Sequence, residues 1–186
     1  MENNGHTVIV KLDQSEKVEL GGLNGRYKAV QFHFHWGSEV EKMQSPGSEH
    51  SIDGERYPME LHVVHIKEEF GNTESAIKGK ALRLESLIPD KKDLTSFYRY
   101  TGSLTTPGCN EEVVWTLFEN LGRIKGFWEK VYFDSEKKLP MVDNFRPVQP
   151  LGARIVEKSN SNLLLPPRKA LLLVPTAALL AFMWIS

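Results

Sequence analysis

The sequence predicts a mainly β protein with short peripheral helices, on the basis of three observations. Several segments alternate polar and apolar residues with the period of two that is typical of a half-buried strand. Turn-forming residues separate these segments, as in GGLNGRY (residues 21–27) and TTPGCN (residues 105–110). Two segments, residues 73–88 and residues 122–132, carry the apolar spacing of an amphipathic helix instead.

Size and charge limit the function classes. The 186 residues are enough for one domain with a hydrophobic core, and the 40% hydrophobic content is ordinary for a globular protein. The formal net charge of −1 argues against nucleic acid as a partner. Cys109 is the single cysteine, so no disulfide can form within the chain. The predicted strands are residues 6–12, 29–36, 59–68, 96–104 and 112–119.

The stretch QFHFHW, residues 31–36, suggests a metal site. Side chains on a strand alternate between its two faces, so Gln31, His33 and His35 share one face. The aromatic residues between them share the other face and would pack into the core. One interpretation is a half-buried strand with one face exposed to solvent. The more specific interpretation is that the two imidazoles, two residues apart, form half of a metal site.

A second strand, ELHVVH, repeats this arrangement. Glu60 precedes His62 on the same face, as Gln31 precedes His33. A zinc-ligating imidazole needs such an acceptor, because its other ring nitrogen must donate a hydrogen bond that fixes the ring. His33, His35 and His62 would supply the three protein ligands of a catalytic zinc site, which keeps a fourth position open.

The C-terminal segment has the composition of a lipid-anchor signal. Small and polar residues around Ser159, Asn160 and Ser161 precede a nearly uncharged tail over residues 170–185, which is short for a membrane-spanning helix. This order of a small-residue site, spacer and apolar tail matches a GPI-attachment signal. The alternative is a packed or aggregating C-terminal helix. The first residues show no secretory signal, so we expect the N-terminus of a parent protein to be missing.

Six motifs together resemble the α-class carbonic anhydrases, and most closely their membrane-anchored branch. Their order is that of the family, and the resemblance spans residues 3 to 156. The motifs are NNGH (residues 3–6), QFHFHWGS (31–38), SEHSIDGERYPMELHVV (48–64), GSLTTPGC (102–109), VVWTLF (113–118) and MVDNFRPVQPL (141–151).

The resemblance implies a central twisted, largely antiparallel sheet and the zinc-dependent, reversible hydration of carbon dioxide to bicarbonate. Residues 1–158 would form a partial carbonic anhydrase domain, and residues 159–186 would be the GPI-attachment signal. The parent protein would lie on the extracellular face of the cell membrane. Aromatic sulfonamides would inhibit it, and bicarbonate transporters are candidate partners.

The resemblance also assigns roles to single residues. Zn²⁺ would be bound by His33, His35 and His62, with Gln31, Glu60 and the carbonyl of Asn144 as hydrogen-bond partners of the three rings. Thr105 would orient the zinc hydroxide and donate its own proton to Glu49, and His6 would shuttle protons to solvent. His50 and His65 are expected to be structural. The substrate pocket would be lined by Val64, Leu104, Thr106, Val113 and Trp115.

Two segments of the family pattern are absent from the chain. One precedes the NNGH motif and would carry the cysteine that pairs with Cys109. The other is an apolar strand with a helix-bearing stretch, expected between His65 and Gly102. We therefore interpret the chain as truncated, and we expect the loss of a central strand to expose two sheet edges and open the core.

Two other function classes remain as alternatives. One is a catalytically inactive truncated isoform or a carbonic-anhydrase-related binding protein, although the retained zinc histidines, Glu49 and Thr105 argue against a binding protein that has lost its metal. The other is a cupin, because HFHWGSE places Glu39 four residues after His35. The glycines and the second motif of a cupin do not align.

Overall fold

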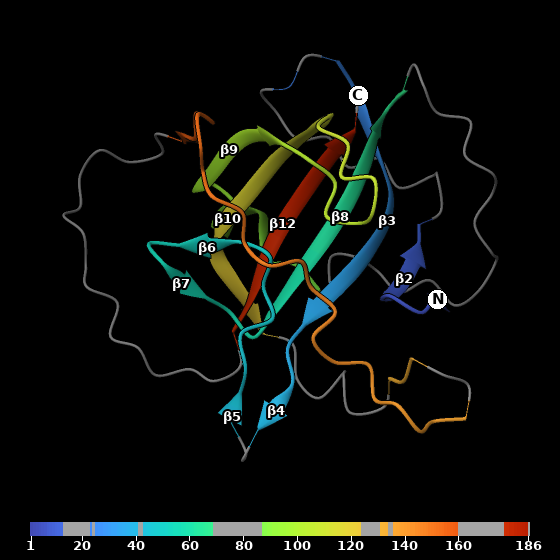
Figure 1. The fold of residues 1–186 in the computed structure, drawn as a ribbon. Helices are drawn as coiled ribbons and strands as arrows, with labels where there is room; N and C mark the ends of the chain where they lie inside the picture. The colour runs from blue at the N-terminus through green and yellow to red at the C-terminus, as the bar shows by residue number, and fades with distance from the viewer. Residues whose placement is uncertain are drawn as a thin grey trace.

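The computed structural model describes residues 1–12, 23, 25–40, 43–68, 87–123, 131–133, 136–159 and 177–185. Eight strands form one sheet, in the order β1-β2-β3-β8-β12-β10-β9-β11 (Figure 1). These strands are β1 (Glu2–Asn3), β2 (Val8–Lys11), β3 (Tyr27–Trp36), β8 (Met59–Lys67), β9 (Phe97–Gly102), β10 (Val113–Arg123), β11 (Glu157–Lys158) and β12 (Ala177–Ile185). Two short hairpins lie outside the sheet: β4 (Glu39–Val40) with β5 (Met43–Gln44), and β6 (Ser51–Ile52) with β7 (Glu55–Arg56).

The sheet is largely antiparallel, as the sequence predicts. Each neighbouring pair runs antiparallel except β8 and β12, which run parallel. Its long strands β3, β8, β12 and β10 lie side by side with a marked twist (Figure 1). Among the described residues the only helix is the 3-10 helix η3 (Lys91–Asp93). The mainly β prediction is therefore confirmed.

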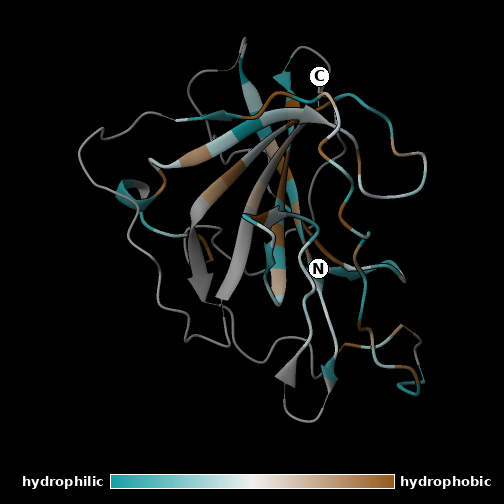
Figure 2. Cartoon of the chain, turned by 60° about the vertical axis from the view of Figure 1, so that its left-hand side comes forward, coloured by the Kyte–Doolittle hydropathy of each residue, from teal (hydrophilic) through white to brown (hydrophobic). Residues whose placement is uncertain are grey.

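Strands β3 and β8 form the centre of the fold. Their antiparallel register places His33 opposite His62 and His35 opposite Glu60. Hydrophilic and hydrophobic residues follow one another along the strands (Figure 2). The predicted alternation of the histidines is thus realised: the histidines share one face, and the aromatic side chains between them point to the other.

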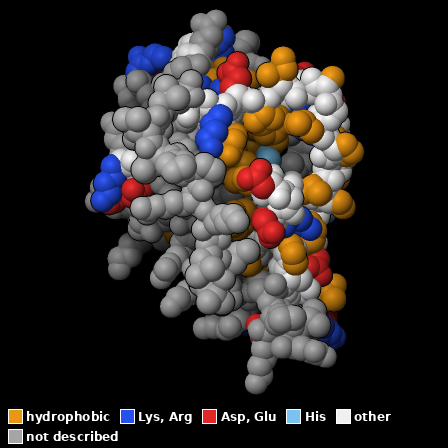
Figure 3. All heavy atoms as spheres, turned by 90° about the vertical axis from the view of Figure 1, so that its left-hand side faces the viewer, with side chains coloured by type: hydrophobic (Ala, Val, Ile, Leu, Met, Phe, Trp, Pro, Cys, Tyr) orange, Lys and Arg blue, Asp and Glu red, His pale blue; other side chains and the backbone are white. Residues whose placement is uncertain are grey.

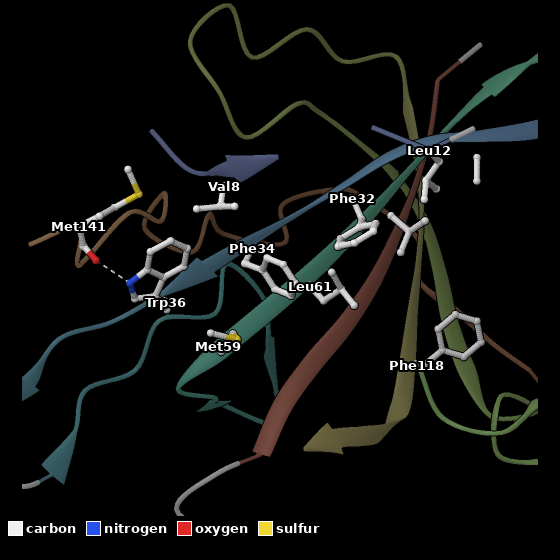
Figure 4. Packing of buried hydrophobic residues seen from close by; sticks show 11 residues of the cluster. Val8, Leu12, Phe32, Phe34, Trp36, Met59, Leu61, Phe118 and Met141 are labelled. Carbon is white, nitrogen blue, oxygen red and sulfur yellow. Dashed lines mark hydrogen bonds between the residues drawn. The ribbon is translucent and has the colours of Figure 1, made fainter. Parts of the chain in front are cut away.

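The aromatic face of β3 packs into the main hydrophobic core. Phe32, Phe34 and Trp36 are buried there together with Leu61 of β8 (Figure 4). The Trp36 indole donates a hydrogen bond of 2.6 Å to the carbonyl oxygen of Met141, which satisfies its buried N–H. The loop that carries Met141 is thereby fixed against β3.

Strand β12 corrects the expectation of an opened sheet. It lies between β8 and β10 and pairs with both along its length (Figure 1). The two edges that the absent family strand was expected to leave exposed are therefore covered by residues 177–185. This apolar segment forms a strand, not the C-terminal helix considered as an alternative. The anchor-signal interpretation of residues 159–186 stays a prediction.

The predicted helices fall mostly outside the described residues. Residues 69–86 and 124–130 are not described, so the helix over residues 73–88 and most of that over residues 122–132 are not tested. Gly122 and Arg123, at the start of the second predicted helix, belong to strand β10. No described helix has the length and apolar character that a membrane span requires.

Candidate metal centre

Three histidine rings from β3 and β8 converge on one point. One nitrogen from each of His33, His35 and His62 lies within 4.8 Å of the others. The ring centroids are 5.1 Å apart for His33 and His35, 5.0 Å for His33 and His62, and 4.5 Å for His35 and His62. All three rings are buried. The sheet register thus brings the predicted ligands together.

Two of the rings are oriented by hydrogen bonds that the sequence analysis predicted. Nδ1 of His35 donates to the carbonyl oxygen of Asn144 at 2.8 Å, and Nε2 of His62 donates to Oε1 of Glu60 at 2.6 Å. Each bond leaves the other ring nitrogen with a free lone pair. Nε2 of His35 has no hydrogen-bond partner among the described residues, and Nδ1 of His62 points toward His33.

Glu60 is the most heavily bonded side chain of the centre. Its Oε1 also accepts a 2.6 Å hydrogen bond from Nδ1 of His50, and its Oε2 accepts two of 2.9 Å from the backbone N–H groups of Glu49 and His50. Burial opposes the charge on Glu60, but His50 and His62 outweigh it and hold the pKa of Glu60 well below its usual range. Glu60 is therefore a buried carboxylate.

His50 is a hydrogen-bond partner of this carboxylate, and it also forms a group with Glu60 and His62 whose ligand atoms lie within 4.8 Å of one another. Its Nδ1 bonds Glu60, and its Nε2 lies 2.6 Å from the hydroxyl of Tyr100. Although burial lowers the pKa of His50, the Glu60 charge outweighs burial and raises it overall. Both ring nitrogens thus have hydrogen-bond partners, and a structural role for His50 stays a prediction.

His33 differs from the other two rings. Its Nε2 lies 3.2 Å from Nδ1 of His62, while its Nδ1 is buried with no partner among the described residues. The predicted hydrogen bond from His33 to Gln31 is therefore not formed in the structure. A cation between the rings would need lone pairs from both facing nitrogens, and His33 has no acceptor that fixes this tautomer.

Burial favours the neutral form of the His33 and His35 rings. It lowers the pKa of His33 well below the usual value and that of His35 by a smaller amount, and the neighbouring His62 adds to both shifts. A neutral imidazole presents the lone pair that a metal ligand requires. The His33 and His35 rings are therefore suited to hold a cation at neutral pH.

The predicted Thr105–Glu49 pair is only partly assembled. Oε1 of Glu49 accepts a 2.6 Å hydrogen bond from the backbone N–H of Arg146, whereas Oε2 is buried with no hydrogen-bond partner among the described residues and lies 3.8 Å from Nε2 of His62. Thr105 and Glu49 line the same cavity. The structure thus places both residues at the site, but the predicted hydrogen bond between them is not formed.

A cavity of about 650 Å³ lies above the histidines. The predicted residues His6, Gln31, Val64, Leu104 and Thr106 line it, as do His33 and His35. The other two predicted pocket residues do not line this cavity: Val113 is buried, and Trp115 packs its ring 4.8 Å from the His62 ring. Both belong to the apolar cluster that also contains Val64.

A second hollow of about 420 Å³ shares Glu49, Thr105 and Arg146 with the first. Hydrophobic side chains surround a recess on this face of the molecule (Figure 3). Trp115 and Leu117 lie on the inner side of this hollow, and the exposed Val148 and Leu151 lie at its rim.

Two residues of the site could not be identified from the sequence. Met183 of β12 lines the first cavity, and the backbone of Arg146 holds Glu49. The apolar tail gave no indication that it joins the sheet, and a backbone donor leaves no pattern in a sequence. Ser159 bonds Thr95 and Phe97 beside β9, whereas Asn160 and Ser161 lie outside the described residues.

Three imidazoles on adjacent strands, each from a buried position, define the site as a candidate catalytic zinc centre. The chain belongs to the family described as eukaryotic-type carbonic anhydrase, which it matches over residues 1–82 and again over residues 77–160. The two matched blocks meet between His65 and Gly102, where the sequence analysis places an absent segment.

Individual relatives agree with this assignment. The chain is 38% identical to carbonic anhydrase 4 of Oryctolagus cuniculus over 224 positions, which include 96% of this chain and 71% of the relative. It is 38% identical to carbonic anhydrase 4 of Rattus norvegicus (95% and 71%) and 34% identical to carbonic anhydrase 7 of Homo sapiens (84% and 75%). The first alignment is longer than the 186 residues here, so the relative has residues without a counterpart in this chain.

Proposed function

We propose that this chain catalyses the zinc-dependent, reversible hydration of carbon dioxide to bicarbonate and a proton. The observation that carries the proposal is the convergence of His33, His35 and His62 within 4.8 Å. Membership of the carbonic anhydrase family supports the reaction.

The donor set fits Zn²⁺. Neutral imidazoles are preferred zinc ligands, and three of them leave a fourth position open. The buried Nε2 of His35 has no partner among the described residues, which is a costly arrangement unless a cation accepts its lone pair. When bound, zinc would lower the pKa of a water to about 7, a chemistry for which carbonic anhydrase itself is the standard example.

The side chains around the cavity divide the remaining tasks. Val64 and Leu104 provide an apolar surface, which suits uncharged carbon dioxide. Thr105 would orient the attacking water and donate its own proton to the partnerless Oε2 of Glu49. His6 is exposed at the same cavity, where its imidazole would carry the released proton to solvent.

We also propose the cell-surface location that the sequence suggests, for the form of the protein that carries a lipid anchor. Its attachment would take place at Ser159, Asn160 or Ser161. Aromatic sulfonamides are the expected inhibitors, and bicarbonate transporters remain candidate partners. The composition of residues 159–186 supports this part of the proposal.

The test uses the full chain, because a chain that ends at Lys158 would lack β12. We expect one equivalent of zinc and a sulfonamide-sensitive hydration of carbon dioxide in stopped-flow measurements. His62→Ala should abolish both zinc binding and hydration. His6→Ala is the matched variant, which should retain zinc and lose turnover in weak buffer. A full chain that binds zinc without hydration above background would support the inactive isoform.

A further inference from the structure

We infer that the C-terminal strand β12 is part of the active site, and that Met183 on it positions the substrate by setting the apolar width of the cavity. The identity of the substrate in this inference rests on the proposed function. The placement of the strand does not depend on that function. It gives a role to a segment whose composition alone suggests a removable signal.

The register of the sheet places β12 beside the ligand-bearing strand. Met183 pairs with Val64 of β8 on one side and with Trp115 of β10 on the other. Ala181 pairs with His62 and with Leu117 in the same way. Paired residues on neighbouring strands share a face of the sheet, so Ala181 and Met183 lie on the face that carries the metal centre.

The contacts of Met183 suit a pocket wall. Its side chain belongs to a cluster with Val64, Trp115 and Leu117, and it lines the cavity above the histidines. Only 5% of it is exposed. An unbranched thioether adapts its shape to its surroundings and offers no hydrogen-bond donor, which suits a surface for an apolar gas. Met183 therefore closes the cavity beside Val64.

The position of β12 makes two uses of the C-terminal segment mutually exclusive. Attachment of a lipid at Ser159, Asn160 or Ser161 would remove all later residues, including β12. Removal would take Met183 from the cavity and Ala181 from beside His62. A chain whose cavity includes Met183 must therefore keep its C-terminal segment. An anchored chain would lack the Met183 side of the cavity.

The placement of β12 can be tested without zinc. In a Cys109→Ser background, Leu117→Cys with Ala181→Cys joins two buried, paired positions of β10 and β12. We expect an intramolecular disulfide in most molecules of the full chain under mild oxidation. The matched control is Leu117→Cys with Ala178→Cys, because Ala178 pairs with Gly122 instead. Equal or lower yield in the paired variant would overturn the placement of β12.

The role of Met183 is tested by sulfonamide affinity of the zinc-loaded chain. Met183→Ala should weaken the binding of an aromatic sulfonamide by roughly fivefold, through lost apolar contact, with zinc content unchanged. Met141→Ala removes another buried methionine, one that does not line the cavity, and it should lower Tm without this loss of affinity. Unchanged affinity in Met183→Ala would overturn the role of Met183. Absence of sulfonamide binding in the unaltered chain would instead count against the proposed function, leaving the disulfide result intact.

Discussion

The β3–β8 pair and strand β12 lie side by side in the sheet, yet they differ in what their sequences reveal. In β3 and β8, histidines alternate with core residues. The strand period, the face that each side chain occupies and the metal-binding chemistry can therefore be predicted from the residues alone. Strand β12 is apolar at almost every position and has no such alternation. It lies in the centre of the sheet, with a neighbour on each side.

This difference teaches that a uniformly apolar segment is ambiguous. A strand buried on both faces shows no alternation, and a parallel neighbour makes that more common. The same composition suits a signal that is removed from the protein. The tertiary position of such a segment depends on which partner strands are available, and here β12 pairs with an edge of β8 and an edge of β10.

The largest expected effect comes from a charge in β12. Ala181 is fully buried in the sheet, so Ala181→Asp would bury an unpaired carboxylate at a cost of several kcal/mol. Because whole domains are stable by only about 5–15 kcal/mol, we expect loss of the urea unfolding transition. Ile155→Asp, at an exposed position, should leave that transition almost unchanged. If the urea unfolding transition of Ala181→Asp matches that of the unaltered chain, β12 contributes little to the stability of the fold.

On the β3–β8 side, the largest effect is expected at Glu60. The Glu60 carboxylate accepts four hydrogen bonds. In Glu60→Gln only one oxygen can accept, because the other position becomes an NH2 group, and the His62 ring loses its charged acceptor. We expect zinc affinity to fall about 10- to 100-fold in competition with a chelator. Glu55→Gln, in the exposed β7 position, is the control and should keep its affinity. Equal affinities would mean that Glu60 does not hold the ligand.

The folding stability should depend on pH through His65, which lies where β8 contacts β12. Burial lowers the pKa of His65 to about 4, and its ring contacts the carbonyl of Val63 and the backbone of Met183. The unfolded chain binds a proton near pH 6.5 that the folded chain resists, so folding stability falls as pH drops from 6.5 to 4. The loss should approach about 3 kcal/mol.

Urea unfolding of the zinc-free chain at pH 7 and pH 4 measures this effect. His65→Gln should be less stable at pH 7 and should lose the part of the pH dependence that His65 contributes. An identical slope in the two proteins would assign the acid sensitivity to other groups.

The smallest effect is expected at Gln31. Although the residue pattern predicts a hydrogen bond to His33, Nδ1 of His33 has no partner among the described residues. Gln31→Ala should therefore change zinc affinity by less than about threefold, well below the change expected for a lost ligand partner. A drop as large as that of Glu60→Gln would show that the bond forms once the metal is bound.

Much of the site could be predicted because strand periodicity fixes which side chains share a face. His33, His35, His62 and Glu60 follow from that rule, and the structure places them together. The expected contacts of Asn144 and Thr105 came from family resemblance, since sequence spacing says nothing about loops that return from distant positions. The structure forms the Asn144 bond to His35 but not the Thr105 bond to Glu49. The contribution of Met183 could not be predicted, because it depends on a strand pairing that local propensity does not encode.

The pairing of Ala178 with Met59 has a consequence for folding kinetics. The two residues are far apart in the chain, and a parallel pair cannot form through a tight turn. Such non-local contacts close large loops and slow the folding rate. Until β12 arrives, β8 and β10 are two open edges that can pair with other chains. We therefore expect slow, concentration-sensitive refolding, in which the yield depends on how quickly the last strand is captured.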